Sequence, residues 1–117
     1  MAVTTVEGST TIKAEDKRLL GKVKNAIQGV LPTATILLYG SASRGTRTSE
    51  SDYDILVLSD NSLTVKEQSV VRDALFDIEL ETGAVICTLF YAKDEWESPL
   101  ARVSPFHREV ERDAVVL

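Results

Sequence analysis

Asp52 and Asp54 are separated by a single residue, and two carboxylates at this spacing could bind a metal ion together. They stand directly before the apolar run 55–58, which predicts a β-strand beginning near them. In a strand, residues i and i+2 point to the same face about 6.6 Å apart, so both carboxylates would converge on one point. They would repel each other unless a cation lies between them, and a hard divalent cation takes oxygen ligands and leaves positions for substrate phosphates. The pair therefore predicts a site for Mg²⁺ or Mn²⁺.

A second pair, Gly40-Ser41, ends the apolar run 34–39 about twelve residues earlier. A glycine at the end of a strand lets the backbone turn sharply and lets a ligand come close. A short helix after it would point its free N–H groups at an anion, and Ser41 adds a hydroxyl donor. The pair therefore predicts a phosphate cradle. For cradle and carboxylates to line one site, the first strand must end where the second begins, so the two strands would run antiparallel if adjacent.

The stretch 40–57 resembles the signature of the nucleotidyltransferase superfamily that includes DNA polymerase β, and within it the small minimal nucleotidyltransferases. That signature is G-S-x-A-R-G, a five-residue spacer, and S-D-x-D-x-x-V. The matching residues are Gly40, Ser41, Arg44, Gly45, Ser51, Asp52, Asp54 and Val57. Ser43 departs, because it stands where the signature usually has alanine. The resemblance covers these 18 residues tightly and the element order of nearly the whole chain loosely.

The resemblance implies a polymerase β-like α/β (α+β) fold, with a small mixed β-sheet and helices packed against it. It implies transfer of a nucleoside monophosphate from a nucleoside triphosphate, expected to be ATP, to a hydroxyl acceptor with release of pyrophosphate. Asp52 and Asp54 would hold the metal, and Gly40 and Ser41 the β- and γ-phosphates. Gly45 and Ser51 complete the expected nucleotide-binding set. Arg44 would either add charge near the phosphates or tie the short helix to the carboxylate strand.

One departure from the family concerns a third acid, which active members usually carry on the third strand. The stretch 84–91 contains no Asp or Glu, and Cys87 falls near the expected place. The nearest acids could substitute only from displaced positions; they are Glu79, Glu81, Asp94 and Glu95. We therefore consider a second hypothesis besides that of an active enzyme: the chain is a weakly active or inactive nucleotide-binding module of antitoxin type. Minimal nucleotidyltransferases often accompany a helical HEPN-type protein in toxin–antitoxin pairs, which makes such a protein a possible partner.

The periodicity of the chain predicts the elements that must position these residues, in the order α-β-β-α-β-α. Helices are expected at 14–31, 64–82 and 106–113, with a helical region at 93–103. Strands are expected at 34–39, 53–59 and 84–91, with a terminal strand at 114–117. Because 84–91 is almost unbroken in its apolar character, we expect it at the centre of the sheet. Residues 1–13 are expected to form a tail, and 14–117 a single domain.

Composition limits the classes of function. The chain has 117 residues, of which 44% are hydrophobic and 26% charged, as is ordinary for one globular domain. A net charge of −5 argues against an extended nucleic-acid footprint. A single cysteine excludes an internal disulfide and a zinc–cysteine cluster. No apolar run has the length of a membrane span, and no signal-peptide pattern is present, so we expect a cytoplasmic protein without membrane contact.

Other residues have simpler interpretations. A P-loop is excluded because no Lys-Ser/Thr pair follows Gly45. Cys87 is expected to be a small buried core residue rather than a nucleophile. His107, the only histidine, is expected in a surface or packing role. Tyr53 lies between the two aspartates and so should point to the opposite face, into the core.

Overall fold

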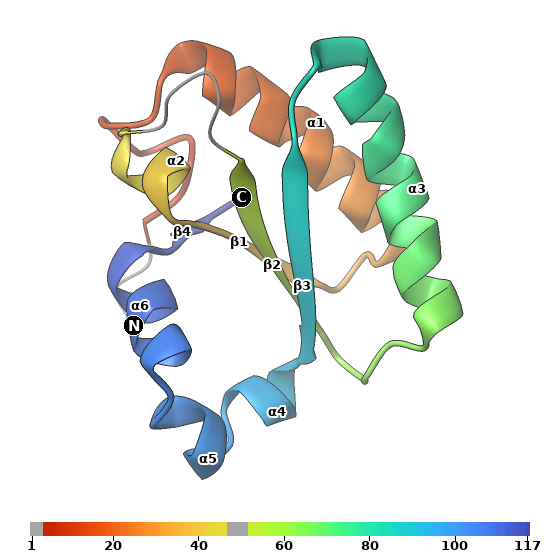
Figure 1. Ribbon diagram of the computed structural model, residues 1–117, viewed down its shortest axis with the longest axis vertical. Coiled ribbons are helices and arrows are strands. Elements are labelled where there is room, and N and C mark those ends of the chain that lie inside the picture. Colours follow the sequence, from red (N-terminus) through yellow and green to blue (C-terminus); the bar gives the residue numbers. More distant parts are fainter. Residues whose placement is uncertain (1–3, 47–51) are drawn as a thin grey trace.

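The computed structural model describes residues 4–46 and 52–117 of the chain (Figure 1). Its centre is a four-stranded mixed sheet in the order β3-β2-β1-β4. The strands are β1 (Thr35–Tyr39), β2 (Tyr53–Ser59), β3 (Ile86–Ala92) and β4 (Val115–Val116). β1 runs antiparallel to β2 and to β4, whereas β2 and β3 are parallel. The expected antiparallel pairing of the first two strands is confirmed.

Helices cover both faces of this sheet. The long helices α1 (Ala14–Val30) and α3 (Val65–Thr82) lie side by side on one face, as Figure 1 shows. The other face carries the shorter C-terminal helices, which are α4 (Lys93–Trp96), α5 (Pro99–Arg102) and α6 (Pro105–Asp113). The one-turn helix α2 (Ser41–Arg44) follows β1 directly. The predicted small mixed sheet with helices packed against it is confirmed.

The period of two in the strands divides the buried side chains between two apolar clusters. On β1, Ile36 and Leu38 pack toward α1 and α3, whereas Leu37 and Tyr39 pack toward Trp96 and the other C-terminal residues. Each fully buried side chain of this size contributes about 1.5–3 kcal/mol of transfer free energy. Because both faces of β1 are buried, neither this strand nor its register can shift without exposing one of the clusters.

The helix ends are set by local hydrogen bonds. Thr64 caps α3 by accepting from the Glu67 N–H, whose side chain accepts in turn from the Thr64 N–H. Gly83 ends α3 in the left-handed conformation with φ of 75°. The two Ser-Pro pairs begin α5 and α6, and each serine hydroxyl accepts from the N–H three residues further on. The terminal strand is also confirmed, as β4.

Two residues with simple interpretations lie where the sequence predicted. Tyr53 is 4% exposed within the cluster under α1, and its hydroxyl donates to Asp16 Oδ1 at 2.5 Å. His107 is buried and stacks on Trp96, with ring centroids 4.2 Å apart, so its role is packing.

The expected position of β3 is wrong, because β3 is an edge strand and not a central one. Its side chains explain the difference. Ile86 and Phe90 pack against the cluster under α3, whereas Cys87 and Leu89 on the opposite face are exposed. The apolar run of β3 therefore belongs to a strand that is covered on one face only. The two central strands of the sheet are β1 and β2.

Residues 4–13 pack against the sheet. Val6 and Ile12 are buried in the cluster under α1, and Thr5 forms a bridge to Val116 of β4. Within residues 4–46 and 52–117, no helix has the length and hydropathy to cross a membrane.

Candidate active site

The glycine–serine pair and the second aspartate meet where β1 ends. In the antiparallel register Tyr39 pairs with Asp54, so the next residue, Gly40, lies against the Asp54 side chain. Gly40 has φ of +77° and ψ of −157°, a conformation that is almost restricted to glycine. A Cβ atom at Gly40 would lie 2.5 Å from Asp54 Oδ2. The close approach of backbone and carboxylate thus requires glycine at this position.

The turn after Gly40 presents the first N–H groups of α2. The Ser43 hydroxyl donates to the Gly40 carbonyl at 2.7 Å and fixes the turn from inside the protein, where Ser43 is buried. The first-turn N–H groups of a helix have no acceptor within the helix, so those of Ser41 and the next residue can bind an anion. Gly45 ends α2 in the left-handed conformation, and a Cβ there would clash with the Thr11 carbonyl oxygen. Gly45 thus lets the N-terminal segment pack beneath the turn.

The two aspartates and Cys87 form one polar group. Asp54 pairs with Cys87 in the parallel register of β2 and β3, and the thiol donates to Asp52 Oδ2 at 3.3 Å. Burial, then the charge of Asp52, then that of Glu109 raise the pKa of Asp54 above its ordinary 3.8. Burial, and then the hydrogen bond to Asp52, raise the pKa of Cys87 to about 11, so the thiol is neutral at pH 7.

The expectation that Cys87 is a buried core residue is wrong. The side chain is exposed beside the carboxylates, because alternate residues of β3 face opposite sides and the Cys87 side is the one that the C-terminal helices leave open.

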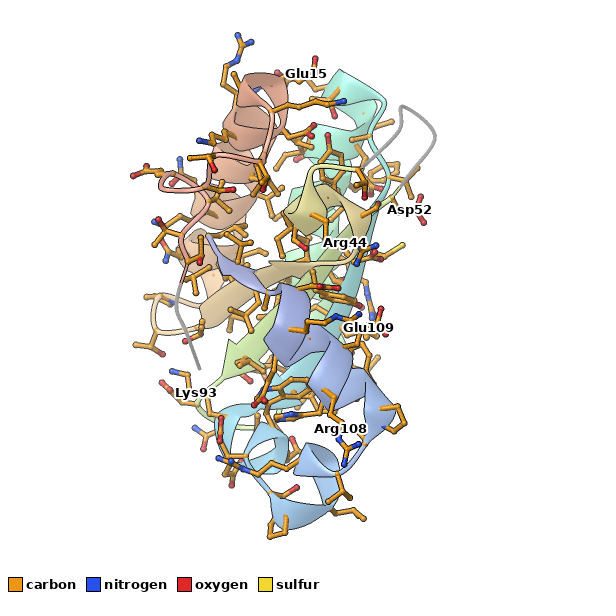
Figure 2. The ribbon with its side chains drawn as sticks, turned by 90° about the vertical axis from the view of Figure 1, so that its left-hand side faces the viewer. Glu15, Arg44, Asp52, Lys93, Arg108 and Glu109 are labelled. Atoms are coloured by element: carbon orange, nitrogen blue, oxygen red, sulfur yellow. The ribbon has the colours of Figure 1, made fainter. Side chains whose placement is uncertain are left out.

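Two neighbours of the pair were missed from the sequence: Tyr39, at the end of β1, and Glu109, on α6. Burial, and then the charge of Asp54, raise the pKa of Tyr39 to about 12, with Glu109 contributing further. The Tyr39 ring packs edge-to-face on Phe106, at 5.5 Å between centroids, which seats α6 next to the site. Figure 2 shows Arg44 on α2, Glu109 on α6 and Asp52 just before β2, along one side of the molecule. Only the folded topology brings α6 here, so no local sequence signal could have identified Glu109.

Arg44 does not tie α2 to the carboxylate strand, which was one of the two roles expected of it. Its guanidinium Nη1 donates to Asp113 Oδ2 at 2.6 Å, which ties α2 to α6 rather than to the carboxylate strand. Asp113 is nearly buried, and burial alone would raise its pKa, but hydrogen bonds from Arg112 and Arg44 outweigh burial and lower it. Arg44 itself remains 46% exposed, so the guanidinium is also accessible from solvent.

Three of the acids that flank β3 have other partners. Glu79 accepts from the Ile86 N–H at 3.0 Å, and Glu81 pairs with Lys22. Glu95 accepts from the Ala92 N–H, at the opposite end of β3 from Cys87. In the part of the chain that the structure describes, no group of three Asp, Glu, His or Cys side chains is placed to hold a metal ion.

The structure thus brings most of the predicted site residues to one end of the sheet. They are Gly40, Ser41, Arg44, Gly45, Asp52 and Asp54. Ser51 was also predicted to belong to this site, but it lies outside the described residues.

This fold and this arrangement agree with the family to which the sequence can be assigned. A family model described as a nucleotidyltransferase domain matches residues 17–113. The chain therefore belongs to the nucleotidyltransferase domain family. A comparison with curated proteins finds no match.

Proposed function

We propose that this protein is a metal-dependent nucleotidyltransferase that transfers a nucleoside monophosphate, from ATP in the first instance, to a hydroxyl acceptor and releases pyrophosphate. The observation that carries the proposal is the contact between Gly40 and Asp54, where a Cβ atom would lie 2.5 Å from the carboxylate. This contact supports the proposal because the turn that we assign as the phosphate cradle lies directly beside one of the two carboxylates. Membership of the nucleotidyltransferase domain family supports the general reaction.

The residues present fit a divalent cation. Asp54 is partly buried beside Asp52 and Glu109, and each of these influences raises its pKa. A cation bound by Asp52 and Asp54 relieves their mutual repulsion, and Mg²⁺ and Mn²⁺ prefer such oxygen donors. When bound, the metal supplies neutralisation of charge on the triphosphate.

The protein's own groups have separate tasks in this proposal. The N–H groups at the start of α2 and the Ser41 hydroxyl bind the β- and γ-phosphates, because free N–H groups at a helix N-terminus attract anions. Arg44, tied to Asp113 and half exposed, holds α2 in place and adds positive charge at its end. Cys87 is neutral at pH 7 and does not accept the proton of the acceptor hydroxyl. Glu109, on α6, is close enough to Asp54 for its charge to raise the pKa of that carboxyl.

Calorimetry tests the binding half of the proposal. A non-hydrolysable ATP analogue should bind the wild-type protein in the presence of Mg²⁺ and lose that metal-dependent binding in the Asp52→Asn/Asp54→Asn variant. Asp77→Asn removes a charge from an exposed position of α3 and is the matched control, which should bind as the wild type does. Unchanged affinity in the double variant would refute the assignment of the two carboxylates.

A second candidate is the antitoxin-type module: a nucleotide-binding domain with little activity of its own that acts with a HEPN-type protein. The observation that favours it is the neutral thiol in register with Asp54, where active family members usually carry an acid. Label transfer from [α-³²P]ATP to a HEPN-type protein encoded beside this gene would favour the enzyme. Stable complex formation without transfer would favour the module.

A cytoplasmic location stays a prediction from the sequence.

A further inference from the structure

The strand β3 has an inner side, which pairs with β2, and an outer side that meets no other strand among the residues that the structure describes. The N–H and C=O of one residue in an extended strand point to the same side, and the side alternates along the chain. The Ile86 N–H donates to Glu79 at 3.0 Å, and the Ala92 N–H donates to Glu95 at 3.0 Å. Neither acceptor belongs to β2, so the even-numbered residues of β3 direct their backbone groups outward.

This outer edge is closed at its two ends and open in the middle. The carboxylates of Glu79 and Glu95 occupy the first and last outward N–H groups. Between them lie Thr88 and Phe90, whose backbone groups also point outward. Proteins usually protect an exposed edge with charged residues or proline, and the sequence of β3 contains neither. The edge is thus left ready to pair over a short, defined stretch.

We propose that a second copy of this chain pairs with that stretch, antiparallel, about a two-fold axis at Leu89. In this register Thr88 lies opposite Phe90 of the second copy, and Phe90 lies opposite Thr88 of the second copy. Each of these two pairs exchanges two backbone hydrogen bonds. The open stretch is symmetric about Leu89, as a two-fold interface requires, and the carboxylate caps limit the pairing to it. Two sheets of four strands then become one continuous sheet.

Charge and apolar surface on α3 also fit a second copy. The Arg72 guanidinium lies over the Phe90 ring, 5.2 Å from its centroid. A groove between α3 and β3 is lined by Arg72, Asp73, Phe76, Glu79 and Thr88, among others, and Phe76 is 55% exposed. Because Phe90 lies opposite Thr88 of the second copy in this register, Arg72 lies beside that copy's Asp73, and the relation is reciprocal. The same edge therefore carries complementary charge on both sides of the axis.

The pairing extends the candidate active site. Cys87, whose thiol contacts Asp52, lies opposite Tyr91 of the second copy in this register. Leu89, which is 43% exposed in the single chain, meets Leu89 of the second copy on the same face. The second copy thus supplies a wall beside the carboxylates, at the place where the single chain is open. The dimer does not depend on the proposed reaction, so either can fail without the other.

Sedimentation velocity on the full chain tests the pairing. Across about 1 μM to 1 mM, the wild type should shift toward twice its 12.8 kDa mass. Thr88→Pro removes the outward N–H at an edge position that tolerates proline, and should remain monomeric over that range. Thr88→Val keeps the N–H and is the matched control, which should dimerise. A wild type that stays monomeric, or a Thr88→Pro variant that dimerises like Thr88→Val, overturns the proposal.

Charge exchange tests the register without relying on the folding of the proline variant. Arg72→Glu alone and Asp73→Lys alone each place like charges together at both reciprocal contacts, and should weaken self-association by roughly 10- to 100-fold. Mixing the two variants makes both contacts complementary again and should restore a dimer. Failure of the mixture to associate more tightly than either variant alone would contradict this arrangement.

Discussion

Replacing Gly40 by alanine perturbs the contact on which the site depends. The native backbone, with φ of +77° and ψ of −157°, lies in a region that costs an alanine of order 1–3 kcal/mol. The added Cβ would lie 2.5 Å from Asp54 Oδ2, so the carboxylate must rotate away, at about 0.5–1.5 kcal/mol for an off-rotamer side chain. Together these terms predict a loss of roughly 1.5–4.5 kcal/mol in the free energy of unfolding. They also predict weaker Mg²⁺ binding, because the carboxylate that we propose as a ligand is displaced.

The cost of backbone strain and the cost of the contact with Asp54 can be measured separately by substituting a second glycine of the chain. Gly83 also has positive φ, of 75°, but no atom lies within 4 Å of the position of its Cβ. Gly83→Ala should therefore carry backbone strain alone, about 1–2 kcal/mol, and leave Mg²⁺ binding unchanged. Chemical denaturation and Mg²⁺ calorimetry on both variants measure the difference.

A double-mutant cycle isolates the contact itself. In an Asp54→Ala background the carboxylate is absent, so Gly40→Ala should cost less than in the wild type, by about 0.5–1.5 kcal/mol. Strictly additive losses in the double variant would show that Gly40 and Asp54 do not touch, and would refute the proposed meeting of cradle and carboxylate.

Three further predictions concern the charges around the pair. Because folding raises the pKa of Asp54, the metal-free protein should lose stability as pH rises from the ordinary 3.8 through the raised value. In Asp52→Asn/Asp54→Asn, melting temperatures against pH should lack this loss and be equal or higher at pH 7; a lower value would contradict the repulsion. Glu109→Gln should lower the pKa of Asp54, measured by carboxyl NMR, and no change would remove Glu109 from the site. Cys87→Asp should raise transfer from labelled ATP by about 10²–10⁴-fold; destabilisation insensitive to Mg²⁺ without faster transfer would refute this.

Much of the fold could be predicted from the sequence, because its signals are local. The strand at 53–59 has the predicted bounds, since apolar side chains run continuously from the carboxylates to the next turn. Gly83 and the two Ser-Pro pairs set helix ends by hydrogen bonds within a few residues of themselves. The antiparallel meeting of Gly40 and Asp54 followed from the requirement that both line one site.

The remaining features depend on contacts between distant segments. Arg44 and Asp113 are 69 positions apart, and nothing local pairs them. Glu109 reaches the site because α6 packs back on Tyr39, which periodicity does not reveal. Cys87 is exposed because the helices leave its face of β3 open, and the apolar sequence of the strand does not indicate which face that is.

The central claim is that Asp52 and Asp54 hold a metal ion beside a triphosphate bound at Gly40-Ser41. A crystal structure with Mn²⁺ and a non-hydrolysable ATP analogue tests it most directly, because the anomalous signal locates the metal independently of the phosphates. We expect a manganese peak within about 2.0–2.3 Å of oxygens from both carboxylates, with the β- and γ-phosphates over the first turn of α2. A nucleotide bound elsewhere, or no manganese peak between the aspartates, would contradict the assignment.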